Sequence, residues 1–171
     1  MTQDGTEAAL RLQAHARYGK RSSMHILLID DDPLDAETVR RVLRNLPTGH
    51  ELEAVSSADE ALRTLSERLA GGGGNRYWTL PDLILVDLNM PGMSGQEFLS
   101  AIESNPRLNA IPVVVLTTSG LPDDVKTCFD RGADGYFVKP LEYARFADLL
   151  TRIIDYWFLC ETPQRSPAIS P

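Results

Sequence analysis

The first decisive stretch of this chain is HILLIDDDP, residues 25–33, in which a short apolar run ends at three aspartates and a proline. Because the apolar residues do not alternate with polar ones, they predict a strand that is buried on both faces of a sheet. Asp32 belongs to the residue types that cap helices, and Pro33 suits the first turn of a helix. The stretch therefore predicts a buried strand followed at once by a helix, with acidic side chains at the junction.

The pattern of a short apolar run followed by a segment of helical spacing recurs four more times. The later apolar runs lie at residues 52–55, 83–86, 112–116 and 135–138. Strands that alternate with helices predict a parallel sheet with helices on both faces. We therefore expect an α/β fold of five βα units, in which the last helix runs from Leu141 to about Leu159.

The length of the chain, 171 residues, predicts one domain with two appendages. We place the domain at residues 24–159. It follows an N-terminal extension at 1–23 that we expect to be flexible, and it precedes a tail at 160–171 that we expect to be disordered. Hydrophobic residues make up 43% of the chain, which is enough to build a core within the domain.

Charge and hydropathy exclude several classes of partner. The net charge of −7 disfavours direct binding to nucleic acid, because an acidic surface repels the phosphate backbone. No apolar run reaches the roughly 18 residues that would span a membrane, and residues 1–24 lack the pattern of a signal peptide. We therefore expect a cytoplasmic protein, in which Cys128 and Cys160 are reduced thiols.

Polar side chains stand directly after four of the predicted strands. Asp30 and Asp31 follow the first strand, and Asp87 follows the third. Thr117 ends the fourth strand, and Lys139 follows the fifth. Since sites in open α/β sheets lie outside the carboxyl ends of the strands, we expect these five side chains to converge. Any one of them alone could be a capping or turn residue, but the set of five is hard to explain structurally.

The chemistry of this set indicates phosphoryl transfer. Three carboxylates in one place repel each other and require a cation, and hard oxygen ligands suit Mg²⁺. Phosphoryl transfer depends on positioning and on neutralising charge, which a metal ion, the Lys139 ammonium and the Thr117 hydroxyl can supply together. An aspartate carboxylate is an established type of acceptor for a covalent phosphoryl group.

Four segments of the chain resemble the receiver domain of two-component response regulators. They are residues 26–33, 85–95, 111–118 and 132–140, and together they span about residues 24–158. The resemblance implies a flavodoxin-like (βα)5 fold, a three-layer sandwich whose five parallel strands lie in the order 2-1-3-4-5. It also implies a signalling domain that accepts a phosphoryl group from a histidine kinase and loses it again, without acting on a separate substrate.

The resemblance assigns the phosphoacceptor and the metal ligands. Asp87 resembles the phosphoacceptor, and Asp30 and Asp31 resemble the acidic pair that binds Mg²⁺. Within that pair, Asp31 matches the direct ligand, whereas Asp30 matches the residue that acts mainly through water. The backbone carbonyl of Asn89 resembles a further ligand of the metal.

The resemblance also assigns a switch. Thr117 resembles the hydroxyl residue that moves toward the phosphoryl group, and Lys139 resembles the cation that pairs with it. Tyr136 resembles the aromatic residue that turns inward when the hydroxyl moves. By the same resemblance, we expect the Lys139–Pro140 peptide bond to be cis, as an X–Pro bond in a tight turn can be.

The expected partners are proteins. Because only a short tail follows Leu159, we expect a receiver without an output domain that signals by contact with a downstream protein or passes its phosphoryl group to a phosphotransfer protein. Tyr156-Trp157-Phe158 and Thr117-Thr118-Ser119 also resemble segments of the small regulators that are paired with bacterial phytochrome kinases. This second resemblance implies a light-sensing pathway.

The last predicted helix carries more apolar residues than one core-facing stripe requires. The core-facing stripe comprises Phe146, Leu149, Leu150, Ile153 and Trp157. A second stripe of Ile154 and Phe158, with Tyr143 and Ala147 nearby, predicts a partner surface and a homodimer. A wide contact with the core is the alternative.

Two other functions remain open at this point. An aspartyl-phosphate phosphohydrolase would also use an aspartate after a strand together with Mg²⁺, but it usually carries a second aspartate two residues later, where this chain has Asn89. A degenerate receiver that serves only as a scaffold is disfavoured by the complete set of site residues. Turnover of a small phosphate ester would favour the enzyme, and failure to bind Mg²⁺ or acyl phosphates would favour the scaffold.

Overall fold

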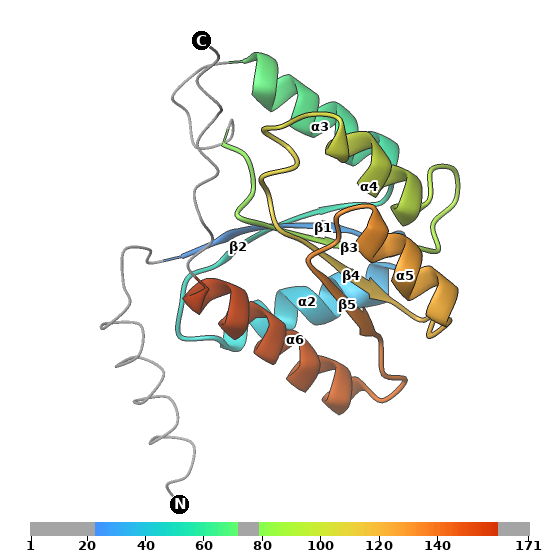
Figure 1. Cartoon of the computed structure of the whole chain (residues 1–171). Coiled ribbons are helices and arrows are strands. Elements are labelled where there is room, and N and C mark those ends of the chain that lie inside the picture. Colours follow the sequence, from blue (N-terminus) through green and yellow to red (C-terminus); the bar gives the residue numbers. More distant parts are fainter. Residues whose placement is uncertain (1–22, 72–78, 161–171) are drawn as a thin grey trace, which may run out of the picture.

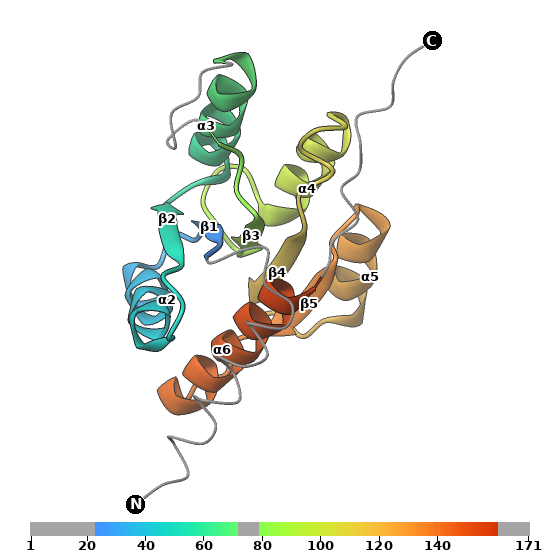
Figure 2. The same ribbon diagram turned by 90° about the vertical axis from the view of Figure 1, so that its left-hand side faces the viewer.

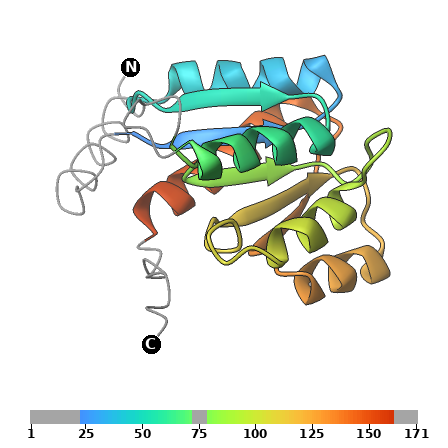
Figure 3. The same ribbon diagram turned by 90° about the horizontal axis from the view of Figure 1, so that it is seen from above.

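Five parallel strands form one sheet in the order β2-β1-β3-β4-β5. The computed structural model describes residues 23–71 and 79–160, so most of the expected extension and tail lies outside the described residues. The strands are β1 (His25–Ile29), β2 (Glu51–Val55), β3 (Leu83–Val86), β4 (Val113–Thr117) and β5 (Gly135–Val138). The strands in Figure 3 point toward the same edge of the sheet. The predicted flavodoxin-like order is therefore confirmed.

Helices cover both faces of the sheet (Figures 1 and 2). They are α2 (Pro33–Asn45), α3 (Ala58–Ala70), α4 (Gly95–Glu103), α5 (Pro122–Asp130) and α6 (Tyr143–Leu159). Buried residues of α3, α4 and α5 share one core cluster, and those of α2 and α6 share the other. Among the described residues, no helix is both long enough and apolar enough to cross a membrane.

The central strands contribute to both clusters, which explains why their sequences do not alternate. Leu27 and Ile29 of β1 belong to the cluster under α3 and α4, whereas Ile26 and Leu28 belong to the cluster under α2 and α6. All four side chains are at most 1% exposed. Because both faces of β1 are covered, its four residues from Ile26 to Ile29 are all apolar, as expected for a parallel sheet between helix layers, and only His25 at its start is polar.

Side-chain caps fix where α2, α3 and α4 begin, and those of α2 and α4 hold turns at the edge of the sheet. The Asp32 side chain accepts a hydrogen bond from the Leu34 amide at 2.8 Å, and the Asp32 amide donates to Asp30 Oδ1 at 2.9 Å. At the start of α4, Ser94 and Glu97 form a reciprocal capping box. The Ser94 amide and hydroxyl lower the pKa of the Glu97 carboxyl. The turns after β1 and β3 are therefore held by local hydrogen bonds.

The predicted partner stripe of α6 is largely a core contact. Ile154 is fully buried in the same cluster as the rest of the core-facing stripe, so its assignment to a partner surface was wrong. Ala147 and Phe158 are half-buried and pack against that cluster, and the Phe158 ring lies edge-on to His50 with centroids 5.0 Å apart. Only Tyr143 of the four predicted residues is exposed, at 50%. The stripe is wide because α6 packs against α2 as well as the sheet.

The two cysteines are both free thiols, as expected. Cys128 is fully buried on α5, and burial, with a smaller contribution from the Asp124 charge, raises the pKa of its thiol to about 11. Its thiolate is therefore scarce at neutral pH, which makes Cys128 a packing residue. Cys160 follows the end of α6 and is half-buried.

Candidate functional site

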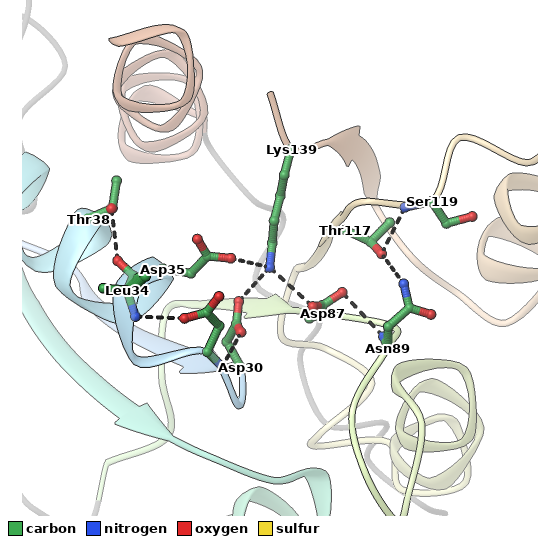
Figure 4. Close-up of polar contacts among 10 residues, drawn as sticks. Asp30, Leu34, Asp35, Thr38, Asp87, Asn89, Thr117, Ser119 and Lys139 are labelled. Carbon is green, nitrogen blue, oxygen red and sulfur yellow. Dashed lines mark hydrogen bonds and ion pairs between the residues drawn. The ribbon is translucent and has the colours of Figure 1, made fainter. Parts of the chain in front are cut away.

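The carboxyl edge of the sheet brings together the polar residues that follow the strands. The Asp87 amide donates to the carbonyl of Ile29 at 3.0 Å, which ties the end of β3 to the end of β1. The Lys139 amide donates to the carbonyl of Thr117 at 2.7 Å, which ties β5 to β4. Figure 4 shows the resulting group, with the Lys139 side chain pointing between Asp30 and Asp87. Strand pairing alone therefore positions the site.

Three carboxylates form a cluster that can hold a metal ion. Oxygen atoms of Asp30, Asp31 and Asp87 all lie within 4.8 Å of one another. Asp30 and Asp87 are buried, whereas Asp31 is exposed, so the cluster opens to solvent on one side. Carboxylate oxygens at this spacing are the ligands that hard divalent cations prefer, and the open side leaves room for water ligands. The residues present thus fit a divalent cation.

The Lys139 ammonium is surrounded by carboxylates. It contacts Asp30 Oδ2 at 2.7 Å and Asp87 Oδ2 at 3.1 Å, as the arrangement of the strands predicts. It also contacts Asp35 Oδ2 at 2.7 Å, and Asp35 is a residue that sequence reasoning missed. The Lys139 side chain is only 5% exposed. Its charge is therefore matched almost entirely by protein groups.

Burial and ion pairing have opposite effects on the pKa values of Lys139 and Asp30. Desolvation by itself lowers the pKa of Lys139, but its hydrogen bonds to Asp30 and Asp35 and the nearby negative charges outweigh it and raise the pKa. Desolvation raises the pKa of the Asp30 carboxyl, and contacts with Lys139 and with the Asp32 amide only partly offset this. Lys139 therefore stays charged, and the Asp30 carboxyl depends on this positive charge to remain ionised.

The Thr117 hydroxyl lies in a hydrogen-bond network beside the cluster. Its oxygen accepts from Asn89 Nδ2 at 3.2 Å and from the Ser119 amide at 3.3 Å. The backbone amide of Asn89 donates to Asp87 Oδ1 at 3.3 Å. Thr117 is fully buried, so its hydroxyl relies on these neighbours. Asn89 thus connects the phosphoacceptor candidate to the switch candidate.

Tyr136 is linked to Thr117 by hydrogen bonds that both involve Ser119. The Tyr136 hydroxyl donates to the Ser119 carbonyl at 2.9 Å, and burial raises the pKa of the phenol. The Ser119 hydroxyl donates to Asp124 of α5, which also accepts from Gln96 Nε2 of α4 at 3.0 Å. The loop after β4 is therefore fastened to two helices. Sequence reasoning missed Asp124 and Gln96, since neither stands at a strand end.

The peptide bond after the lysine differs from expectation. None of the peptide bonds in the described part of the chain is cis, so the expected cis Lys139–Pro140 bond is wrong for this structure. The Lys139 ammonium nevertheless reaches Asp87, because pairing of β5 with β4 already places its backbone.

Residues 26–151 match the family model of the response regulator receiver domain. The chain belongs to this family. Receiver domains are signalling domains that accept phosphoryl groups from histidine kinases and bind a divalent metal at an acidic pocket, which accords with the carboxylate cluster. The known family features and the geometry of the site therefore agree.

Several known receivers are similar to this one in sequence and structure. "Response regulator Rcp1" of Synechocystis sp. is 34% identical, with 77% of this chain and 87% of the relative covered. "Probable methanogenesis regulatory protein FilR2" of Methanothrix harundinacea is 36% identical over 77% of this chain and 82% of the relative. The phosphorylated cyanobacterial phytochrome response regulator RcpA superposes with a TM-score of 0.71 and 32% identity, over 79% of this chain and 94% of the other. The Mn²⁺-bound form of Rcp1 superposes with a TM-score of 0.70 and 33% identity, over the same shares.

A glycine allows the backbone of the receiver to close around the phosphoacceptor candidate. Gly95 is buried at the start of α4, and its amide donates to the Leu88 carbonyl at 3.2 Å. A Cβ atom at this position would lie 2.3 Å from the Asp87 carbonyl oxygen and 3.0 Å from the Leu88 Cα. Both neighbours are backbone atoms, so an added methyl group would displace the turn that carries Asp87.

We expect Gly95→Ala to lower the free energy of unfolding by about 1–3 kcal/mol, the range for overpacking a filled site. Gly49→Ala is the matched control, because a Cβ there would have nothing within 4 Å. Urea unfolding of both variants beside the wild type measures the difference. Equal midpoints for the two variants would contradict the steric argument.

Proposed function

We propose that Asp87 accepts a phosphoryl group from the phosphohistidine of a histidine kinase in a Mg²⁺-dependent reaction. The observation that carries the proposal is the Asp87 carboxylate, which belongs to the metal-binding cluster and also contacts the Lys139 ammonium at 3.1 Å. In the transfer, an Asp87 oxygen forms a bond to phosphorus while the phosphorus–nitrogen bond to the imidazole breaks. The electron pair of that bond leaves with the imidazole.

The chain's own residues supply binding and positioning. Asp30, Asp31 and Asp87 would hold Mg²⁺ together with the Asn89 carbonyl, and Mg²⁺ would neutralise the charge that develops on the phosphoryl oxygens. The Lys139 ammonium supplies a second, fixed positive charge that is already in contact with Asp87. Since the transition state spreads its charge over several oxygens, two cations on one carboxylate can stabilise it together.

The switch follows from the hydrogen bonds around Thr117. A phosphoryl group on Asp87 adds roughly −1.5 to −2 charge and three acceptor oxygens beside this hydroxyl. If Thr117 turns toward them, it leaves Asn89 and Ser119, and the Ser119 carbonyl that holds the Tyr136 hydroxyl can then move. The altered surface comprises α5, β5 and α6, where we expect a downstream protein or phosphotransfer protein to bind.

The phosphoacceptor assignment predicts one phosphoryl group per chain. Incubation of the wild type with acetyl phosphate and Mg²⁺ should give a single retarded band on a phosphate-affinity gel, which EDTA abolishes. Asp87→Asn should remove the band, because an amide is not a phosphoryl acceptor. Asp123→Asn, in the exposed first turn of α5, is the control and should be labelled like the wild type.

The outcomes of this experiment separate the receiver from the other two functions. Absence of a band in the wild type, under conditions that label another receiver, would refute the phosphoacceptor assignment and favour a scaffold. Continuous turnover of a small phosphate ester would favour a phosphohydrolase. The structure places Asn89, which cannot donate a proton as a carboxylic acid does, in contact with Thr117.

We further propose that the kinase partner is a phytochrome. The support is the similarity to the phosphorylated cyanobacterial phytochrome response regulator RcpA, which is 32% identical over 79% of this chain. A purified phytochrome kinase should transfer its phosphoryl group to this chain faster than unrelated histidine kinases do, measured as kcat/KM for Asp87 labelling. Equal rates from all kinases would refute the assignment.

We propose a second copy of the chain as a partner of α6, through the exposed edge of its stripe. Tyr143 remains exposed there and lies under the Arg41 guanidinium, 5.8 Å from the ring centroid. Half-buried Ala147 lies one turn further along α6, and half-buried Phe158 lies near the other end of the helix. In sedimentation equilibrium, Tyr143→Ser should weaken the dimer about tenfold, since it removes an aromatic anchor. Tyr156→Ser, at an exposed tyrosine elsewhere on the helix, should not. A monomeric wild type would refute the dimer.

A further inference from the structure

Asp35 occupies a place in the site that the metal cluster and the switch do not explain. An ammonium group has three hydrogens, and Lys139 meets three carboxylate oxygens, those of Asp30 and Asp35 at 2.7 Å and that of Asp87 at 3.1 Å. The two shorter contacts are thus made by residues other than the phosphoacceptor candidate. Figure 4 shows Asp35 and Asp87 approaching the ammonium from either side.

The start of α2 holds Asp35 in this place. Pro33 is the first residue of the helix and Asp32 caps it, so Asp35 falls in the first turn, where the helix dipole favours a negative charge. The Asp35 side chain is 23% exposed, whereas the side chains of Asp30 and Asp87 are at most 10% exposed. Asp35 therefore offers Lys139 a carboxylate that is set by the helix and partly hydrated.

The three partners of Lys139 differ in what a metal ion would do to them. Asp30 and Asp87 belong to the carboxylate cluster, and Asp35 does not. A cation bound in the cluster would bind two of the carboxylates that Lys139 also contacts, and phosphorylation would change Asp87 itself. Of the three carboxylates that contact the ammonium, Asp35 is the one that neither event engages directly.

We infer that Asp35 is a positioning residue, which holds the Lys139 ammonium beside Asp87. The ammonium N–H that donates to the Asp87 carboxylate can then donate to a phosphoryl oxygen instead. The inference rests on the proposed phosphorylation of Asp87. A lysine side chain is flexible, and a fixed acceptor on one side limits the positions that the ammonium can take. This role depends on the acceptor oxygen more than on the negative charge.

The first test needs neither metal nor phosphoryl donor. In the metal-free protein, the Lys139 ammonium should give a ¹H–¹⁵N signal in NMR, because three carboxylates slow the exchange of its hydrogens with water. Asp35→Ala should accelerate that exchange about tenfold or broaden the signal away. Asp123→Ala, which removes a carboxylate from the first turn of another helix with Pro at its start, should leave the signal unchanged. An unchanged signal in Asp35→Ala would overturn the inference.

The second test measures labelling by acetyl phosphate at saturating Mg²⁺. Asp35→Ala should lower the rate about tenfold, the effect of one charge-assisted hydrogen bond. Asp35→Asn loses the same charge but keeps an acceptor oxygen, so it should recover most of the rate. Equal rates for Asp35→Ala and Asp35→Asn would mean that charge alone matters, and would overturn the positioning role. Circular dichroism and urea midpoints of both variants establish that α2 still forms.

A double-mutant cycle shows whether Asp35 acts through Lys139. In a Lys139→Met background, Asp35→Ala should cause no further decrease in the labelling rate, because its only route of action is already gone. Additive losses would overturn the inference while leaving the proposed function intact. If the wild type itself is not labelled, the proposed function fails, and the inference fails with it.

Discussion

Repulsion among carboxylates at the carboxyl edge of the sheet is the constraint on which the rest of the site depends. Asp30 and Asp87 are buried, and together with Asp31 their oxygens lie within 4.8 Å. Burying like charges in this way is strongly unfavourable unless cations and hydrogen bonds compensate. Within residues 23–71 and 79–160, Lys139 supplies the cation that contacts Asp30 and Asp87. The remaining negative charge is what makes the cluster a binding site for a divalent metal.

The fold makes this arrangement possible because its stability comes from elsewhere. Both core clusters are built from strand and helix residues that are almost entirely buried, while the site lies where the strands end. Backbone pairing between neighbouring strands, such as the bond from the Lys139 amide to the Thr117 carbonyl, sets the positions of the site residues. The apolar core thus stabilises the fold, while the charged residues of the site lie outside this core, at the ends of the strands.

The sequence predicted the strands and the polar residues at their ends because both follow from local patterns, whereas the strand order came from the resemblance to receiver domains. A buried strand needs apolar residues at every position, and the residue after it must lie at the edge of the sheet. Tertiary packing could not be read in this way. Ile154 seemed surplus to one helical stripe, yet α6 packs against α2 as well as the sheet and buries it.

The site residues that could not be predicted from the sequence were missed for one common reason. Asp35 stands in a helix, four residues after the acidic pair, and its contact with Lys139 joins positions 104 residues apart. Asp124 of α5 likewise meets Ser119, and Gln96 of α4 donates to Asp124 in turn. Such contacts depend on how helices pack on the sheet, which no spacing within one segment encodes. An acidic residue in the first turn of the helix after DDDP was the only available indication, and capping explains it equally well.

The hydrogen bonds of Thr117 explain why the proposed switch would be an equilibrium between two loop arrangements of similar free energy. Moving the hydroxyl to a phosphoryl oxygen breaks two bonds that each contribute about 0.5–1.5 kcal/mol, and forms a charge-assisted bond of about 1.5–3 kcal/mol. These contributions nearly balance, so the proposed phosphorylation of Asp87 would shift the populations of two loop arrangements. A protein that binds the shifted arrangement then adds its own binding energy to the same equilibrium. By linkage, such a partner must also stabilise the phosphorylated site, so output and phosphorylation are coupled in both directions.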